Sequence, residues 1–207
     1  METLRGKSHD RLKNYKEAIS SYQSALVLEN PTVAKANLHF RLGWVYMRAK
    51  MSAETGLDHL RKANLVLLAY LANNGQDEGA TQLYLEVIQK MCSVLIKDKG
   101  LDEALQLAKK ATQIAKSDPE TYIMLGKIQD RKGLNQEAID TFTHALKLQT
   151  VQSPPKAGVF FHIATCHERL KDYKKAVLNY KKCLTLEPRH FGACLHLANL
   201  LANVGEG

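Results

Sequence analysis

The feature of this sequence that most constrains its fold is an internal repeat. Four segments share a small residue, a ring or apolar residue four positions later, and another small residue three positions after that. These spacings place all three side chains on one face of a helix. The small residues let a second helix approach closely, and the larger one fills the gap. The four sets are Ala18, Tyr22 and Ala25; Ala104, Ala108 and Ala111; Ala138, Phe142 and Ala145; and Ala176, Tyr180 and Cys183.

A second helix is predicted upstream of these segments. It carries a Leu-Gly or equivalent pair: Leu42 with Gly43 (and Tyr46 three beyond), Leu125 with Gly126, Ile163 with Ala164, and Met91 with Cys92. The prolines fall between units, at Pro31, Pro119, Pro154, Pro155 and Pro188. A proline inside a helix would cost about 3 kcal/mol, so this placement favours intact helices. The sequence therefore predicts that each unit is a helical hairpin.

Composition excludes several protein classes. The 207 residues are 45% hydrophobic and 24% charged, which is typical of a folded globular chain rather than a disordered one. Only 12 glycines and 5 prolines disfavour an all-β fold, which would need frequent turns. The longest apolar run, residues 65–72, is too short to span a bilayer, and no secretory signal opens the sequence. We therefore expect a soluble protein.

The cysteines and the charge pattern bear on compartment and partners. Cys92, Cys166, Cys183 and Cys194 fit no disulfide framework or zinc template, which favours a reducing compartment such as the cytoplasm or nucleus. The net charge of +8 is concentrated in residues 1–50 and 156–207. An acidic partner is therefore compatible with the sequence but not required by it.

The recurrence resembles the tetratricopeptide repeat (TPR) family over essentially the whole chain, and most closely in residues 121–147 and 158–188. The resemblance implies an all-α, right-handed α-solenoid of tandem helix-turn-helix hairpins, forming one superhelical domain over residues 1–207. Its approximate units are residues 1–31, 32–75, 76–118, 119–155 and 156–189, with a half-unit at 190–207. Neither end resembles a cap, so we expect a fragment of a longer array.

The departures from the family pattern predict longer elements. Residues 52–73 and 78–97 each read as a long helix, and residues 190–204 as the first helix of a further unit. Residues 2–13 read as a poor opening helix, and residues 149–155 as an extended loop. The stretch 65–71 is apolar nearly all round and needs cover on more than one side, from a neighbouring helix or from a dimer partner.

No catalytic constellation is present in the sequence. The paired carboxylates at residues 77–78 and 102–103 fall at predicted helix starts, where the helix dipole favours acidic side chains. His162 and Cys166 share a helix face opposite Cys183, but Cys183 occupies the position of a packing alanine, which favours a buried core thiol over a metal ligand. We expect no enzyme activity, no cofactor and no metal site.

In the TPR family, the first helix of each hairpin lines a concave groove that holds extended peptides or helices. The resemblance implies that these groove positions are Phe40, Trp44, Gln89, Ser93, Ile123, Lys127, Phe161, Thr165, Leu195 and Asn199. Several of them stand where some family members carry a clamp for a chaperone's terminal carboxylate, so that ligand is poorly supported. The largely apolar set instead suits an amphipathic helix or an apolar extended segment.

The sequence therefore predicts a protein–protein interaction scaffold in a larger cytoplasmic assembly, with cytoskeletal, ciliary or nuclear assemblies as variants. Its partner would be a peptide or amphipathic helix. The alternative is self-association, a homodimer formed through the apolar 65–71 stretch or the uncapped ends. We expect no membrane insertion. Most basic residues lie along second helices and in turns, away from the groove, so we expect no nucleic-acid binding.

Overall fold

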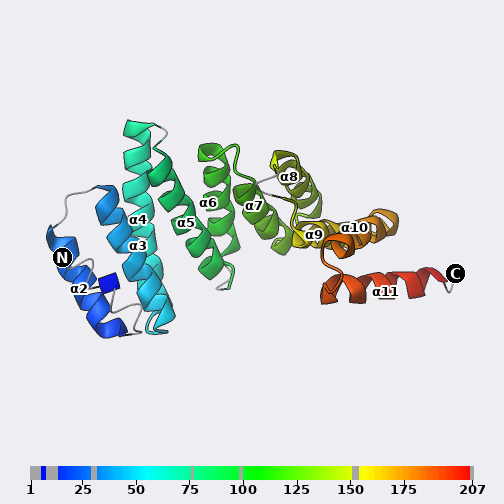
Figure 1. Ribbon diagram of the computed structural model, residues 1–207, viewed down its shortest axis with the longest axis horizontal. Helices are drawn as coiled ribbons and strands as arrows, with labels where there is room; N and C mark the ends of the chain where they lie inside the picture. Colours follow the sequence, from blue (N-terminus) through cyan, green and yellow to red (C-terminus); the bar gives the residue numbers. More distant parts are fainter. Residues whose placement is uncertain are drawn as a thin grey trace. The chain divides into compact units, whose positions relative to one another are not determined.

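The computed structural model describes residues 6–7, 14–28, 32–75, 77–97, 100–150 and 154–205. In these residues the chain forms ten α-helices, α2 to α11, and no strand, which confirms the all-α prediction (Figure 1). The chain divides into two compact units, Met1–Gly100 and Leu101–Gly207, and each is described here by itself. The predicted hairpin of residues 76–118 has its first helix in one unit and its second in the other.

The first unit contains α2 (Tyr15–Leu28), α3 (Val33–Arg48), α4 (Ala53–Asn74) and α5 (Glu78–Leu95). Each of these helices packs against the next one along the chain (Figure 1). Between α2 and α3, Tyr22 is fully buried and packs in one cluster with the small residues around it. That cluster consists of Ala18, Ile19, Tyr22, Ala25, Leu38, Leu42 and Val45. The small-large-small pattern therefore forms a helix–helix contact, as the repeat predicts.

Two glycines set the closest approach between α3 and α4. A Cβ atom on Gly43 would lie 2.7 Å from the carbonyl oxygen of Gly56, closer than side-chain atoms approach in proteins. Backbone cannot give way as a flexible side chain can, so both positions exclude larger residues. Gly43 and Gly56 therefore let the backbones of α3 and α4 come into direct contact.

Helix α4 is covered on two sides. It packs against both α3 and α5, and Leu60, Ala63 and Leu67 are fully buried. Of the apolar stretch 65–71, Leu65 alone is a large exposed side chain. The Ser52 hydroxyl accepts a hydrogen bond from the Thr55 backbone N–H and starts the helix. Neighbouring helices therefore supply most of the cover that this stretch requires.

The second unit contains α6 (Leu101–Ile114), α7 (Pro119–Arg131), α8 (Asn135–Leu148), α9 (Ala157–Arg169), α10 (Tyr173–Leu186) and α11 (Phe191–Gly205). Successive helices pack against each other, and α9 also contacts α7. Phe142 is fully buried between α7, α8 and α9, and Tyr180 between α9, α10 and α11. A Cβ atom on Gly126 would lie 2.7 Å from the Phe142 ring, so this glycine makes room for that ring.

The turns inside three hairpins share one geometry. Lys50, Gly133 and Lys171 each have a positive φ, of 53°, 77° and 61°. After each helix, the backbone N–H of the next residue bonds to a carbonyl five positions back, as in Asp172 to His167 and Leu134 to Gln129. This is the Schellman pattern, which satisfies the last carbonyls of a helix and reverses the chain. Lysine at two of these positions adopts a conformation that glycine takes more easily.

The predicted long helices match the structure closely. Residues 52–73, 78–97 and 190–204 correspond to Ala53–Asn74, Glu78–Leu95 and Phe191–Gly205. The predicted opening helix at residues 2–13 lies outside the described residues except for residues 6–7, and Pro31 and residues 151–153 of the predicted loop also lie outside them. Within that loop Gln149 is extended, as expected.

Candidate functional site

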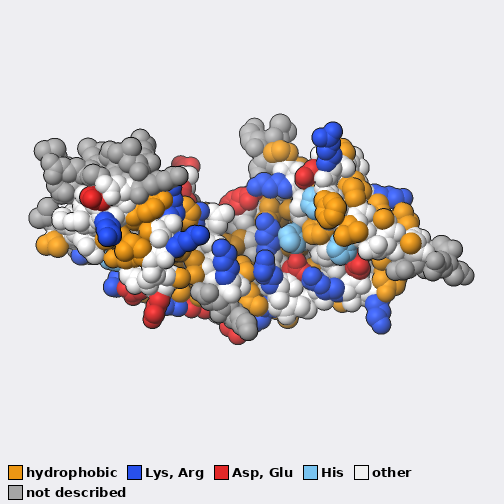
Figure 2. All heavy atoms as spheres, turned by 90° about the horizontal axis from the view of Figure 1, so that it is seen from below, with side chains coloured by type: hydrophobic (Ala, Val, Ile, Leu, Met, Phe, Trp, Pro, Cys, Tyr) orange, Lys and Arg blue, Asp and Glu red, His pale blue; other side chains and the backbone are white. Residues whose placement is uncertain are grey.

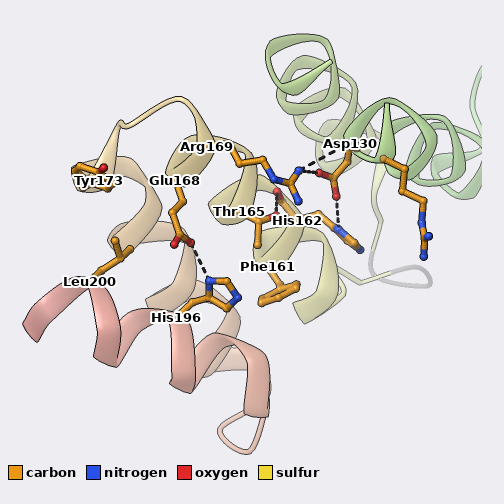
Figure 3. A pocket seen from close by; sticks show the side chains of 10 residues that line it. Asp130, Phe161, His162, Thr165, Glu168, Arg169, Tyr173, His196 and Leu200 are labelled. Carbon is orange, nitrogen blue, oxygen red and sulfur yellow. Dashed lines mark hydrogen bonds and ion pairs between the residues drawn. The ribbon is translucent and has the colours of Figure 1, made fainter. Parts of the chain in front are cut away.

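The second unit contains a pocket of about 790 Å³, which we call the α9 pocket. Four helices supply its walls: α7 ends there, α9 runs along it, α10 begins beside it, and α11 closes one side (Figure 3). First helices of successive hairpins therefore form most of this site. Its lining residues are Asp130, Arg131, Phe161, His162, Thr165, Glu168, Arg169, Tyr173, His196 and Leu200.

Asp130 lies at the centre of one polar network in this pocket. Its carboxylate is 8% exposed and pairs with His162 Nδ1 at 3.0 Å and with the Arg169 guanidinium, and it accepts a hydrogen bond from the Cys166 thiol at 3.5 Å. Burial alone would raise the pKa of Asp130, but the bonds from His162 and Arg169 outweigh it and lower that pKa. Burial, with the Asp130 charge next, raises the pKa of Cys166 to about 12, so this thiol stays protonated.

Glu168 lies at the centre of a second network. Its Oε2 atom accepts a hydrogen bond from the Tyr180 hydroxyl at 2.5 Å and pairs with His196 Nδ1 at 2.9 Å. Tyr180 belongs to α10 and His196 to α11, so one carboxylate on α9 joins three helices. Figure 3 shows the pairing of Glu168 with His196. Burial, reinforced by the bond to Glu168, raises the pKa of Tyr180 well above its usual value. The hydroxyl therefore remains a donor at any physiological pH.

Phe161 supplies the main apolar surface of the pocket. Its half-buried ring lies 5.9 Å from the rings of His162 and Tyr180, 5.8 Å from His196 and 4.7 Å from His190, centroid to centroid. Rings at these separations and tilts attract each other and fix the orientation of the phenyl group. Figure 2 shows histidine side chains beside a hydrophobic patch on this part of the surface, with Lys and Arg side chains around them.

Of the six groove positions predicted in the second unit, two line the pocket. Phe161 and Thr165 both face it, whereas Lys127, Leu195 and Asn199 are exposed but are not among its lining residues. The sixth, Ile123, was predicted to face the groove, and that prediction is wrong. Ile123 is 4% exposed and packs in the core with Phe142, because α8 covers that face of α7.

The first unit contains a second, smaller hollow of about 520 Å³, which includes Trp44 and Ser93 in its lining. The Lys90 ammonium of α5 lies 4.1 Å from the centre of the Trp44 ring, a cation–π contact that holds the indole. Phe40 is half-buried and Gln89 is exposed.

The residues of the repeat signature occupy the helix contacts. Most are buried, with Tyr46 half-buried and stacked on His59, and Pro188 exposed in the turn before α11. The buried members are Ala18, Tyr22, Ala25, Leu42, Gly43, Ala104, Ala108, Ala111, Leu125, Gly126, Ala138, Phe142, Ala145, Ala164, Ala176 and Tyr180.

No group of three His, Cys, Asp or Glu side chains in the described part of the chain could hold a metal ion. Cys166 bonds instead to Asp130, and Cys183 packs in the core beside Tyr180. Among the described helices, none is both long enough and apolar enough to cross a bilayer.

The sequence analysis placed His162 and Cys166 on one helix face but did not predict the charged residues Asp130, Glu168 and Arg169 of the pocket. His162, Cys166 and Arg169 are spaced four and three apart, which places them on one face of α9 and was a readable signal for a shared partner. Their partner Asp130 lies on another helix, and the pairing of Glu168 with His196 also crosses between hairpins. No local sequence pattern predicts the contacts of Asp130 or of Glu168 with these residues.

Comparison with known proteins places these hairpins in a repeat family. The family model described as "Tetratricopeptide repeat" matches residues 119–151 and 157–190, which contain α7 to α10. A "Probable biofilm formation methyltransferase WspC" from Pseudomonas putida is 40% identical over 55 residues. That match covers 27% of this chain and only 13% of the methyltransferase.

Solved structures match over nearly the whole chain. YrrB, described as "a TPR protein with an unusual peptide-binding site", has a TM-score of 0.70 at 21% identity, covering 94% of this chain and 88% of its own. One MamA structure has a TM-score of 0.63 at 20% identity, covering 91% of both chains. The apo form of RapI has a TM-score of 0.74 at 17% identity, covering 92% of this chain and 54% of its own. At these identities the likeness establishes the solenoid fold.

Proposed function

Because the chain carries tetratricopeptide repeats, we propose that it holds a segment of another protein in the α9 pocket and thereby acts as a scaffold in a larger cytoplasmic assembly. The fold is that of an interaction scaffold. The observation that carries the finer proposal is the α9 pocket itself, a hollow of peptide-binding size whose walls are first helices. YrrB, with the same fold, is described as having a peptide-binding site.

The pocket is ordered before any partner arrives. Asp130 and Glu168 fix three other lining side chains, His162, Arg169 and His196, by ion pairs and hydrogen bonds. Phe161 is held by neighbouring rings. A preformed site loses little conformational freedom on binding, so more of the contact energy appears as affinity. The remaining expectation, that the chain has no enzyme activity, stays a prediction.

Site-specific photocrosslinking tests this function. Tyr173 lines the pocket, is 44% exposed, and can be replaced by the ring-containing crosslinker p-benzoylphenylalanine. Leu178 on the same helix is 53% exposed, is absent from the pocket lining, and serves as the control position. We expect protein adducts from position 173 in cells and none of the same species from position 178. Equal adducts at both positions, or none at 173, would contradict the proposal.

One observation favours the alternative of self-association. Helix α11 exposes Phe191, Leu195 and Leu201, at 79%, 48% and 51% of their surface. Apolar side chains grouped on one helix are typical of a surface that another protein covers. The α4 stretch 65–71 has Leu65 as its single large exposed apolar side chain and so offers much less apolar surface to a partner. A second copy of the chain is therefore a candidate partner for α11.

A further inference from the structure

The two carboxylates of the α9 pocket already have partners within the protein. Asp130 interacts with His162, Arg169 and Cys166, and Glu168 with Tyr180 and His196. Both carboxylate oxygens of Asp130 are engaged, and Oε2 of Glu168 takes part in both of that residue's interactions. An entering ligand therefore meets Asp130 already paired with the Arg169 cation, and Glu168 already hydrogen-bonded within the fold.

The cationic groups beside the pocket are not engaged in the same way. Arg131 lines the pocket, is exposed, and makes no hydrogen bond or ion pair with any described residue. Lys127 lies one turn earlier on α7, is exposed, and also has no such partner among the described residues. Arg169 is 51% exposed and bonds through Nη1, so its Nε and Nη2 donors remain open.

The pocket therefore offers a ligand unused donors together with an apolar surface. The apolar surface is the half-buried Phe161 ring, whereas Leu200 of α11, which also lines the pocket, is only 5% exposed (Figure 3). A basic segment would add positive charge to Arg131, Arg169 and Lys127 and would meet carboxylates that already have internal partners. A nucleic acid carries a phosphate at every nucleotide and would bring some of them against Asp130 and Glu168. Both occupants fit these charges poorly.

On the proposed function, on which this step rests, we infer that the α9 pocket selects an acidic protein segment in which aspartate or glutamate flanks an apolar residue. The apolar side chain packs on the Phe161 ring. The flanking side-chain carboxylates pair with Arg131 and with the open donors of Arg169. Arg–carboxylate pairs are bidentate and directional, which fixes the register of the segment. The ligand group is a side chain within the segment, so no chain terminus is needed.

Peptide display on the full chain tests this inference directly. A random twelve-residue library, fused through its C-terminus to a phage coat protein, offers side-chain carboxylates and no free terminal carboxylate. Selection is run in parallel on the wild type, Phe161→Ala and Arg131→Gln. We expect the wild type to enrich peptides with acidic residues flanking an apolar one, and neither variant to enrich them. Circular dichroism verifies that each variant is folded, and Phe161→Leu replaces Phe161→Ala if the latter is not.

Affinity of one enriched peptide then separates specific pairing from general charge attraction. By fluorescence anisotropy, Arg131→Gln is expected to weaken binding about tenfold, as loss of an interfacial Arg–carboxylate pair does. Lys181→Gln removes the same charge from an exposed position of α10 outside the pocket lining and is expected to leave the affinity within about twofold. Equal losses in the two variants would overturn the inference.

The outcomes distinguish this inference from the function on which it rests. Basic or uncharged peptides that bind the wild type and are lost in Phe161→Ala would overturn the acidic preference but support pocket binding. Peptides that bind the wild type, Phe161→Ala and Arg131→Gln equally well would overturn both the acidic preference and the proposed function of the pocket. A labelled oligouridylate that binds more tightly than the enriched peptides, and depends on Arg131, would replace the acidic segment by a nucleic acid.

Discussion

At the scale of single residues, two histidines of the first unit face each other across α3 and α4. The Nδ1 atoms of His39 and His59 lie 3.0 Å apart, which requires that at least one ring nitrogen carry no proton. His39 is 8% exposed. Burial, then the charges of His59, Lys62 and Lys35, lowers the pKa of His39 to about 4, while Asp58 acts weakly in the opposite direction. The pKa of His59 is also lowered, mainly by burial.

This pair predicts that the protein loses stability in mild acid. Between pH 6.5 and about 4 the unfolded chain binds a proton at position 39 that the folded chain does not, so unfolding becomes easier as the pH falls. The lost free energy of unfolding reaches at most about 3 kcal/mol. Urea denaturation at a series of pH values measures it. His39→Gln is expected to flatten this dependence, whereas His144→Gln, at an exposed position, should leave it unchanged.

At the scale of helices, glycines set how closely the two helices of a hairpin approach each other. A Cβ on Gly126 would meet the Phe142 ring at 2.7 Å, whereas a Cβ on Gly158 of α9 would meet nothing within 4 Å. We expect Gly126→Ala to lower the free energy of unfolding by about 1–3 kcal/mol through overpacking. Gly158→Ala is expected to raise it by about 0.5 kcal/mol through better helix propensity. Thermal denaturation of both variants measures the difference; equal effects would show that α7 and α8 have room to separate.

The same scale shows what the sequence could and could not predict. Alanines at Ala138 and Ala145 around Phe142 report the contact between two consecutive helices, so hairpins and helix bounds were predictable from spacing. The side chains that face the groove were harder to predict from spacing. Ile123 faces a core because its exposure depends on the rotation of α7 against α8, and a one-residue change in register moves a side chain by about 100° around a helix. Asp130 and Glu168 were missed because their partners lie in other helices.

At the scale of the whole molecule, exposed apolar surface predicts how the chain self-associates. A stable dimer buries about 800 Å² on each partner, far more than Leu65 alone supplies. Helix α11 offers Phe191, Leu195 and Leu201. We expect light scattering to give a mass that rises above 23.2 kDa with concentration. The double variant Leu195→Glu, Leu201→Glu should abolish the rise.

The control for this experiment is Leu65→Glu, which is expected to leave the mass unchanged at every concentration. A rise that Leu65→Glu abolishes would move the interface to α4. A constant monomer across the micromolar range would remove self-association from consideration and leave the scaffold function alone.

The position of Glu168 has a consequence for how this protein can evolve. Its carboxylate shapes the α9 pocket and also joins α9 to α10 and α11, so a substitution there changes partner preference and folding stability together. Arg131 and Tyr173 lie at the same pocket with exposed side chains. Most proteins are stable by only a few kcal/mol, so substitutions that change partner preference without loss of folding stability are tolerated best. Arg131 and Tyr173 are positions of that kind. Divergence in specificity should therefore begin at Arg131 and Tyr173, with Glu168 held in place by its second role.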